Sequence, residues 1–406
     1  MSKRTVIIGA GHAAGQLVTS LRQKGYDGSI VLLGDEQYLP YQRPPLSKKF
    51  LAGELPAERL LVKPPGFYDD QDIDVRLGTR VTAIDRFAKT VETDTGETVE
   101  YTTLVFATGA KVNRLSCPGS ALPGIHYLRN IEDVDRIRAD SQGGARVIII
   151  GAGYIGLEVA AILREAGSDV VVLETADRVM SRVVSPPVSA FFERIHREHG
   201  VDLRLSTGLQ SFEGEQRFEA ALTTSGDRVE GDIAIVGIGI SPNTELAEAA
   251  GIDVDDGIVV DSHCRTSDPD VFAIGDCTRH PNAIYQRSLR LESVQNALEQ
   301  AKTAAANITG VDDEYNEVPW FWSDQYSLKL QIAGLSEGFD DYVLRGNPDD
   351  NSFSCAYLRD GKLIAIDSIN APKDFMLSKP LIKDACQIDP AVLADTSLTM
   401  RDMRQD

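Results

Sequence analysis

A chain of 406 residues with 42% hydrophobic residues is long enough for two or three globular domains. Its 61 acidic residues outnumber 41 basic ones, which gives a formal net charge of −20. A surface of that sign argues against general binding to nucleic acids or to anionic membranes, because both require positive charge. We expect neither of these partners.

The five cysteines predict reduced thiols and not a disulfide framework. Their number is odd, none belongs to a C-x-x-C pair, and residues 1–15 lack the apolar region of a secretory signal. The longest apolar stretch, 147–163, contains three glycines and Glu158. We interpret this stretch as strand, turn and helix and not as a membrane span. These features predict a cytoplasmic protein, which we expect to be a monomer or a weak dimer.

The chain begins with a strand, a glycine-rich turn and a helix. Residues 4–14 combine a buried strand with the pattern Gly9-x-Gly11-x-x-Ala14. In this fingerprint the first glycine allows a tight turn, the second lets a pyrophosphate approach the backbone, and the third small residue lets helix pack on strand. The free N–H groups of the helix N-terminus favour the phosphates. After the next predicted strand, Asp35 is placed to bind a ribose.

A second copy of this arrangement follows within 146–174. It carries Gly151, Gly153 and Gly156, and its second strand ends at Glu174. Because both copies have the strand, the helix, the next strand and the acid, we expect the chain to bind two dinucleotides, or one dinucleotide and one flavin dinucleotide. Holding two such groups allows a hydride to pass from one to the other.

Glu174 indicates which nicotinamide is used. A carboxylate at this position pairs with a 2′-hydroxyl and repels a 2′-phosphate, so we expect NADH to be preferred. Arg178 and Arg182 lie downstream and would weaken that preference.

Other segments complete a familiar pattern: 104-LVFATG-109, 237-GIGISPN-243, 266-TSDPDVFAIGDC-277 and 319-PWFWSDQ-325. With the two glycine-rich copies they resemble FAD flavoproteins of the glutathione-reductase-like superfamily with two dinucleotide-binding domains. The closer resemblance, over essentially the whole chain, is to bacterial NADH-dependent ferredoxin reductases of the putidaredoxin reductase type. Its most specific pieces are 44-PPLSKKFLAG-53, 153-GYIGLEVAA-161, 181-SRVVSPPVSAFFERIHREHGV-201 and 319-PWFWSDQY-326.

The resemblance implies a set of cofactor-binding residues. For FAD these are Gly9, Gly11, Ala13 and Ala14 at the pyrophosphate, Asp35 at the adenosine ribose, Val81 at the adenine, Asp276 at the ribityl chain, Val294 at the isoalloxazine edge, and also Lys48 and Arg129. For NAD they are Gly151, Gly153, Gly156, Glu158, Glu174 and, near the nicotinamide, Gly239.

Two matches concern the chemistry. Lys48 and Glu158 resemble the pair that the family places beside the reactive edge of the flavin, where the lysine stabilises negative charge and the glutamate orients it. The alternative is two solvated side chains without contact. Trp322 resembles an aromatic residue that flanks the flavin, whereas for Trp320 we expect core packing.

The stretch 36–53, where disulfide reductases of this fold carry their redox cysteines, contains no cysteine. A flavin can release electrons singly, so a one-electron acceptor is expected. The resemblance implies that the acceptor is a 2Fe-2S ferredoxin, which supplies a cytochrome haem-thiolate monooxygenase or a ring-hydroxylating dioxygenase. Alternatives are an NADH oxidase, a rubredoxin reductase, or a redox-responsive flavoprotein of the apoptosis-inducing type.

The expected architecture is α/β, with two Rossmann-like domains and a C-terminal α+β domain. The FAD domain would be discontinuous, with residues 1–110 and 245–318, the NAD domain would span 111–244, and the C-terminal domain 319–406. In the last, the pair 360-DG-361 predicts a hairpin turn.

Two hypotheses concern surface residues. The stretches 41–63 and 279–302 carry an excess of basic residues, and we expect Arg287 and Arg290 to contribute to a ferredoxin-docking patch, unless these charges pair within the fold. His196 and His199 have a spacing that can bind metal, but no further ligand completes a site, so we expect no metal and a solvated helix face.

Overall fold

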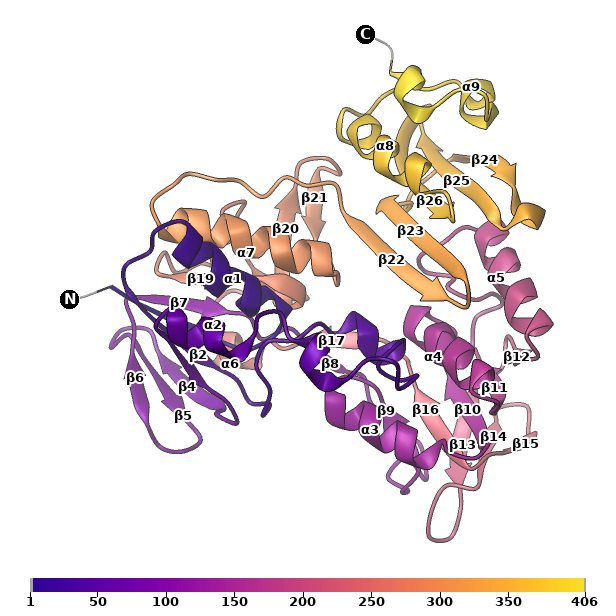
Figure 1. Cartoon of the computed structure of the whole chain (residues 1–406), viewed down its shortest axis with the longest axis horizontal. Coiled ribbons are helices and arrows are strands. Elements are labelled where there is room, and N and C mark those ends of the chain that lie inside the picture. Colours follow the sequence, from indigo (N-terminus) through magenta and orange to yellow (C-terminus); the bar gives the residue numbers. More distant parts are fainter. Residues whose placement is uncertain (1–2, 405–406) are drawn as a thin grey trace. The chain divides into compact units, whose positions relative to one another are not determined.

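The computed structural model describes residues 3–404 and consists of two units, each of which contains a five-stranded parallel sheet (Figure 1). Unit 1 comprises residues up to Arg43, Glu58–Lys111 and Ser241–Pro319. Unit 2 comprises Pro44–Ala57, Val112–Ile240 and the residues from Trp320 onward. The chain passes from unit 1 to unit 2 within the short strand β8 (Ala110–Val112), and it returns to unit 1 within the short strand β17 (Ile240–Pro242).

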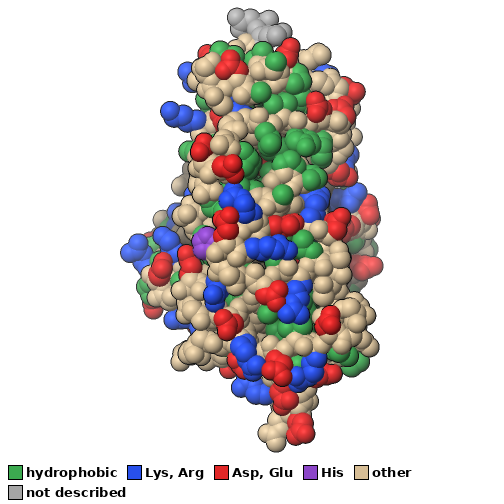
Figure 2. All heavy atoms as spheres, turned by 90° about the vertical axis from the view of Figure 1, so that its right-hand side faces the viewer, with side chains coloured by type: hydrophobic (Ala, Val, Ile, Leu, Met, Phe, Trp, Pro, Cys, Tyr) green, Lys and Arg blue, Asp and Glu red, His purple; other side chains and the backbone are tan. Residues whose placement is uncertain are grey.

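The surface mixes charges of both signs. On the face drawn in Figure 2, acidic and basic side chains lie interspersed, and hydrophobic side chains gather over part of the same face. Some charges pair directly: Arg146 contacts Glu230 and Asp232, and Arg228 contacts Glu213 and Glu230. The acidic excess is therefore not concentrated in one region of this face.

The sheet of unit 1 begins with the strand of the first glycine-rich copy at its centre. Its order is β19 (Val271–Ala273), β7 (Thr103–Phe106), β1 (Arg4–Ile8), β2 (Ser29–Leu33) and β3 (Ile73–Arg76). All neighbouring strands are parallel. The pairing of β19 with β7 confirms that a segment far along the chain returns to the first sheet.

Both faces of this sheet are covered, because successive side chains of each strand point to opposite sides. The covering elements are α1 (His12–Gln23) and α7 (Val294–Ile308) on one face, and β4 (Val81–Asp85), β5 (Thr90–Thr93) and β6 (Thr98–Glu100) on the other. Ile7 and Leu32 pack toward the helices, whereas Val6 and Phe106 pack toward the antiparallel strands. The remaining elements of unit 1 are α2 (Pro65–Asp70), α6 (Glu245–Ala249), β18 (Ile258–Val259), η3 (Gly275–Cys277), β20 (Thr278–Asn282) and β21 (Arg287–Leu289), with η2 (Ala57–Leu60) at its border.

The parallel sheet of unit 2 repeats this design around the second glycine-rich copy. Its order is β12 (Asp202–Arg204), β11 (Asp169–Leu173), β10 (Arg146–Ile150), β16 (Ile233–Val236) and β9 (Ile125–Tyr127). The helices are α3 (Ile131–Asp140), α4 (Tyr154–Glu165) and α5 (Pro186–Glu198), and the antiparallel strands are β13 (Leu209–Glu213), β14 (Ala220–Thr223) and β15 (Arg228–Glu230). Ile148 and Ile150 of the sheet pack against Phe212 and Phe218 of the antiparallel side.

An antiparallel sheet completes unit 2. Its order is β22 (Trp320–Gln325), β23 (Leu328–Gly334), β26 (Lys362–Ile369), β25 (Ser352–Arg359) and β24 (Asp341–Asn347). It is accompanied by η4 (Pro348–Asp350), α8 (Pro372–Lys383), α9 (Pro390–Ala394) and η5 (Met400–Met403), and η1 (Pro44–Ser47) also belongs to this unit. Asp360 and Gly361 have φ angles of 53° and 73° and join β25 to β26, which confirms the predicted hairpin turn.

The structure confirms the predicted α/β class with two Rossmann-like sheets and a C-terminal α+β part. Within residues 3–404 we find no helix with the length and apolar composition that crossing a membrane requires.

Candidate cofactor sites and a buried lysine–glutamate pair

The first glycine-rich turn has the geometry that its sequence predicts. Gly9 has a φ of 102°, and a Cβ atom there would lie 2.3 Å from the carbonyl oxygen of Ala107, so only glycine fits. Gly11 caps α1, and apart from its own chain neighbours no described atom lies within 4 Å of the position of its Cβ. Ala13 and Ala14 are buried at the start of the helix. The turn therefore leaves the N-terminus of α1 open to an anion.

The Gly-Asp segment lies against this turn. A Cβ atom on Gly275 would be 3.2 Å from that of Ala13, which brings Asp276 close to the start of α1. The N–H of Gly275 donates to Oε1 of Gln300 on α7 at 2.7 Å. Val294 is the first residue of the same helix. Unit 1 thus places Gly275, the neighbour of Asp276, between α1 and α7, the helices that begin after Gly11 and at Val294.

The two acids after β2 have different surroundings. Asp35 is about half exposed and contacts Arg80 at 3.1 Å. Glu36 is more buried, and its carboxylate accepts hydrogen bonds from the Tyr41 hydroxyl at 2.6 Å and from Arg43 at 2.5 Å. Asp35 thus remains accessible to a ribose, whereas Glu36 organises the segment that follows it. Val81 is buried at the start of β4.

The second glycine-rich turn repeats the first one closely. Gly151 has a φ of 101°, and a Cβ there would lie 2.4 Å from the carbonyl oxygen of Gly237. A Cβ on Gly156 would lie 2.1 Å from the carbonyl oxygen of Gly151, so the helix can approach the strand only without a side chain at this position. Gly153 caps α4 and, among described residues, has open space before it.

Glu174 is fixed on the second turn. Its Oε2 accepts the N–H of Ala152 at 2.7 Å, and its Oε1 accepts the N–H of Ala176 at 2.8 Å. Oε1 also accepts the Thr175 hydroxyl at 3.2 Å, whereas Oε2 can accept a further hydrogen bond, so Glu174 can also bind a ribose hydroxyl. The guanidinium of Arg178 is turned away, because it donates to the carbonyl oxygens of Ser181 and Val184.

Two other predicted residues lie in unit 2. Gly239 is exposed with a φ of 95°, and the nearest guanidinium nitrogen, from Arg182, lies 3.7 Å from the position of its Cβ. Arg182 is therefore the basic side chain close to the predicted nicotinamide position. Arg129 precedes the N-cap of α3, where its N–H donates to Asp133 at 2.9 Å.

Lys48 and Glu158, which are far apart in the sequence, form a buried ion pair. Nζ of Lys48 lies 2.7 Å from Oε2 of Glu158, and the two side chains are 15% and 3% exposed. The Ser47 hydroxyl also donates to Oε2 at 2.5 Å, and the Ser323 hydroxyl donates to Oε1 at 2.6 Å. The carboxylate thus has three donors in place of water, as a buried charge requires.

Ser47 and Ser323 were not among the predicted site residues, although they lie in the motifs PPLSK and PWFWSDQ. The predicted contact between Lys48 and Glu158 is present. Trp322 lies on β22, and its ring centroid is 5.7 Å from that of Trp320. Trp320 also packs against Phe375.

A family model described as pyridine nucleotide-disulphide oxidoreductase matches residues 3–301, and a model described as reductase C-terminal matches residues 320–404. The chain belongs to the pyridine nucleotide-disulphide oxidoreductase family. Rhodocoxin reductase of Rhodococcus erythropolis is 43% identical over 397 residues, which cover 98% of this chain and 93% of that protein. Putidaredoxin reductase CamA of Pseudomonas putida is 43% identical over 404 residues, which cover 98% and 96%.

A solved structure gives the same result. The covalent putidaredoxin reductase–putidaredoxin complex contains a chain with a TM-score of 0.96 and 42% identity, covering 99% of this chain and 98% of that one. The resemblance to the putidaredoxin reductase type is confirmed. Membership of the family also confirms an oxidoreductase with FAD and NADH as cofactors. Both glycine-rich turns fit such dinucleotides, because each presents an open helix N-terminus at Gly11 or Gly153.

The two predicted docking arginines differ. Arg290 is 19% exposed and pairs with Asp256 at 3.2 Å and with Glu292. The structure therefore agrees with the alternative for Arg290, in which its charge pairs within the fold. Arg287 lies exposed at the start of β21 and stays a docking candidate.

The expectation of a solvated helix face is wrong for His196. This side chain is fully buried on α5, where its Nε2 lies 2.8 Å from Oε1 of Gln325, whereas His199 is exposed. Among residues 3–404 no group of three or more His, Cys, Asp or Glu side chains is arranged to hold a metal ion.

Proposed function

We propose that this protein is a ferredoxin reductase, which takes a hydride from NADH and delivers electrons singly to a 2Fe-2S ferredoxin. The ferredoxin would supply a cytochrome haem-thiolate monooxygenase or a ring-hydroxylating dioxygenase. The proposal is supported by the similarity to rhodocoxin reductase and putidaredoxin reductase, and by a matching structure that was solved as a complex with putidaredoxin.

The state of the thiols is the observation that carries this proposal. All five cysteines are free. Burial raises the pKa of every one of these thiols, to about 12 for Cys355, so they stay protonated and are poor nucleophiles. In the segment where disulfide reductases carry redox cysteines, Lys48 is bound to Glu158 instead. Electrons therefore have no thiol route out of the protein, and a one-electron carrier is the natural acceptor.

Bound FAD would accept the hydride and release electrons one at a time. We assign Gly9, Gly11, Ala13, Ala14, Asp35, Lys48, Val81, Arg129, Asp276 and Val294 to FAD, and Gly151, Gly153, Gly156, Glu158, Glu174 and Gly239 to NAD. Lys48 would hold positive charge where the reduced cofactor carries negative charge, with Glu158 fixing the direction of its ammonium group. Trp322 would cover the cofactor. Asp35 and Glu174 would select riboses by accepting hydrogen bonds from their hydroxyls.

We also keep two further inferences as proposals. The chain would divide into an FAD domain of residues 1–110 and 245–318, an NAD domain of 111–244 and a C-terminal domain of 319–406. The protein would work in the cytoplasm, where its reduced thiols are stable.

Steady-state turnover with several acceptors tests the function. The purified protein should release FAD on denaturation and should oxidise NADH with a 2Fe-2S ferredoxin much faster than with rubredoxin, oxygen or a low-molecular-weight disulfide. Fast turnover with rubredoxin or oxygen and none with any ferredoxin would support the corresponding alternative. Turnover with the disulfide would refute the argument from the thiols.

A further inference from the structure

A continuous series of hydrogen bonds leads from Glu158 to Tyr326 within unit 2. Ser323, which donates to Glu158, lies 3.2 Å from Nε2 of Gln325. Oε1 of Gln325 lies 2.8 Å from Nε2 of His196, and Nδ1 of His196 lies 3.3 Å from the hydroxyl of Tyr326. Ser323, Gln325 and His196 are each at most 1% exposed.

The amide of Gln325 gives this series of hydrogen bonds a direction. Its Nε2 contacts two acceptors, Oγ of Ser323 and Sδ of Met180 at 3.9 Å, so its Oε1 faces His196. His196 must then donate from Nε2 and accept at Nδ1 from Tyr326. Burial lowers the pKa of His196 to about 4, in agreement with a neutral ring. Every donor along the series therefore points toward Glu158.

Helices and strands hold both ends of this series of hydrogen bonds. Ser323 and Gln325 lie two residues apart on β22, so their side chains share one face of the strand. Tyr326 forms the turn to β23 with a φ of 55°, and its ring stacks on His199 with centroids 3.7 Å apart. His196 lies on α5, and Glu158 lies on α4, which begins at the second glycine-rich turn.

We propose that His196 and Gln325 are positioning residues for the Lys48–Glu158 pair. Through Ser323 they fix the rotation of the Glu158 carboxylate, so that Oε2 stays directed at Lys48. A carboxylate held only by Ser47 and Lys48 could rotate about χ3 of Glu158, because the energy minima of terminal sp³–sp² torsions are broad. Such a rotation would break its contact with the ammonium group of Lys48. The expected effect on the rate of flavin reduction by NADH rests on the proposed function. The expected effect on the acetylation rate of Lys48 does not.

The test compares four variants of the FAD-containing enzyme. Gln325→Met removes the polar contacts to Ser323 and His196 at nearly constant volume, and His196→Leu removes the ring that links Tyr326 to Gln325. His196→Gln is the conservative variant, because its amide can still donate to Gln325. Ile195→Ala is the matched control, since Ile195 is buried on the same helix outside this series of hydrogen bonds.

Two measurements are made on each variant. The first is the rate of Lys48 acetylation by acetic anhydride, followed by mass spectrometry, with exposed Lys49 as the internal standard. The second is the stopped-flow rate of flavin reduction by NADH. We expect Gln325→Met and His196→Leu to raise the acetylation rate and to slow reduction, each by about threefold to tenfold, the effect of one lost hydrogen bond. His196→Gln should restore both rates.

The outcomes separate the hypotheses. The positioning role is overturned if Gln325→Met leaves both rates within experimental error of the wild type, or if Ile195→Ala changes them as much, since that would indicate general loosening. Failure of the wild-type enzyme to reduce any ferredoxin would instead remove the proposed function, and the acetylation result would still decide on the role of His196 and Gln325.

Discussion

Three donors surround the buried carboxyl group of Glu158, and one of them is the ammonium group of Lys48. We expect Lys48→Met and Glu158→Gln each to slow flavin reduction by NADH, because each leaves the other member without its partner. The double variant should lose less of the reduction rate than the sum of the two single effects predicts. The difference corresponds to a coupling energy of about 1–3 kcal/mol. Stopped-flow rates for the four proteins measure this coupling, and strictly additive effects would show that the pair does not act as a unit.

Asp367 is a second buried carboxyl group in unit 2, and it accepts a hydrogen bond from the Tyr357 hydroxyl. Burial raises its pKa from 3.8 to about 7. The folded protein therefore holds a proton that the unfolded chain has released, and the free energy of unfolding falls as pH rises from about 4 to about 7, by at most about 1.4 kcal/mol per pH unit. Above that window this contribution is constant.

The variant Asp367→Asn lacks this titration. Its melting temperature relative to the wild type should rise between pH 5 and pH 8, whereas exposed Asp384→Asn should show no such trend. A difference between Asp367→Asn and the wild type that does not change with pH would show that Asp367 is ionised throughout this range.

Glu174 should decide between NADH and NADPH. Glu174→Ala removes this carboxylate. It should lower the ratio of kcat/KM for NADH over NADPH by a factor that corresponds to about 1–3 kcal/mol, the size of one charge-assisted contact. Arg182 lies near Gly239, at the predicted nicotinamide position, so Arg182→Ala should change kcat/KM for NADH and for NADPH alike and leave their ratio unchanged. An unchanged ratio in Glu174→Ala would place the 2′-position elsewhere.

At the scale of elements, the two strand–turn–helix copies could be predicted because their signals are local. Glycine spacing fixes the turns, as the φ angles of Gly9 and Gly151 show. The contact between Lys48 and Glu158 could not be derived from local patterns, since the two residues are 110 positions apart and only the family resemblance suggested their pairing. Long-range contacts of this kind depend on the complete tertiary fold.

The burial of His196 was missed although a signal existed. Val188, Phe192 and His196 follow each other at intervals of four, which places them on one side of a helix. The first two are apolar and buried, so His196 continues the buried stripe. The partner of the ring, Gln325, could not be foreseen, because it comes from a strand of the C-terminal sheet.

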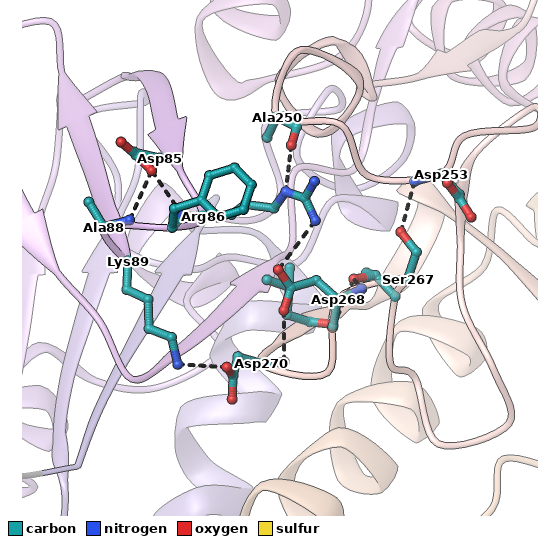
Figure 3. A network of polar contacts seen from close by, with 12 residues as sticks. Asp85, Arg86, Ala88, Lys89, Ala250, Asp253, Ser267, Asp268 and Asp270 are labelled. Carbon is teal, nitrogen blue, oxygen red and sulfur yellow. Dashed lines mark hydrogen bonds and ion pairs between the residues drawn. The ribbon is translucent and has the colours of Figure 1, made fainter.

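Unit 1 is assembled from distant segments, and a polar network joins two of them (Figure 3). Arg86, just after β4, donates to the carbonyl oxygen of Ala250 at 2.6 Å and contacts Asp268 at 3.4 Å. Lys89, in the same turn, contacts Asp270 at 2.6 Å. Arg86 is 26% exposed and Lys89 is 42% exposed, so the two contacts should contribute differently to the free energy of unfolding.

We expect Arg86→Ala to lower the free energy of unfolding by about 2 kcal/mol, because it leaves partly buried acceptors without a donor. Lys89→Ala should change it by less than about 0.5 kcal/mol, as is usual for exposed ion pairs. Denaturant titrations give both values, and hydrogen exchange should show faster opening of residues 250–270 in Arg86→Ala alone. Equal effects of the two variants would mean that burial does not set the strength of this network.

For the whole molecule, the net charge of −20 raises the question of how an acidic ferredoxin would dock. The basic stretches of the sequence are partly neutralised by the fold, since Arg43 pairs with Glu36, Arg279 with Asp255, and Arg290 with Asp256. Arg287, on β21, is exposed, whereas the side chain of Arg290 is only 19% exposed, so Arg287 is the more accessible of the two arginines that we predicted.

A positive docking site should raise the association rate and weaken with salt, because charges are screened over about 8 Å at physiological ionic strength. We expect Arg287→Glu to raise KM for ferredoxin about tenfold at low salt, to lose most of this effect at high salt, and to leave NADH-dependent ferricyanide reduction unchanged. Arg359→Glu, at the exposed end of β25, makes the same change in net charge and serves as the control. If both reversals raise KM equally, the total charge governs the encounter and not a local patch. If neither changes KM, the ferredoxin docks on a surface that does not include Arg287.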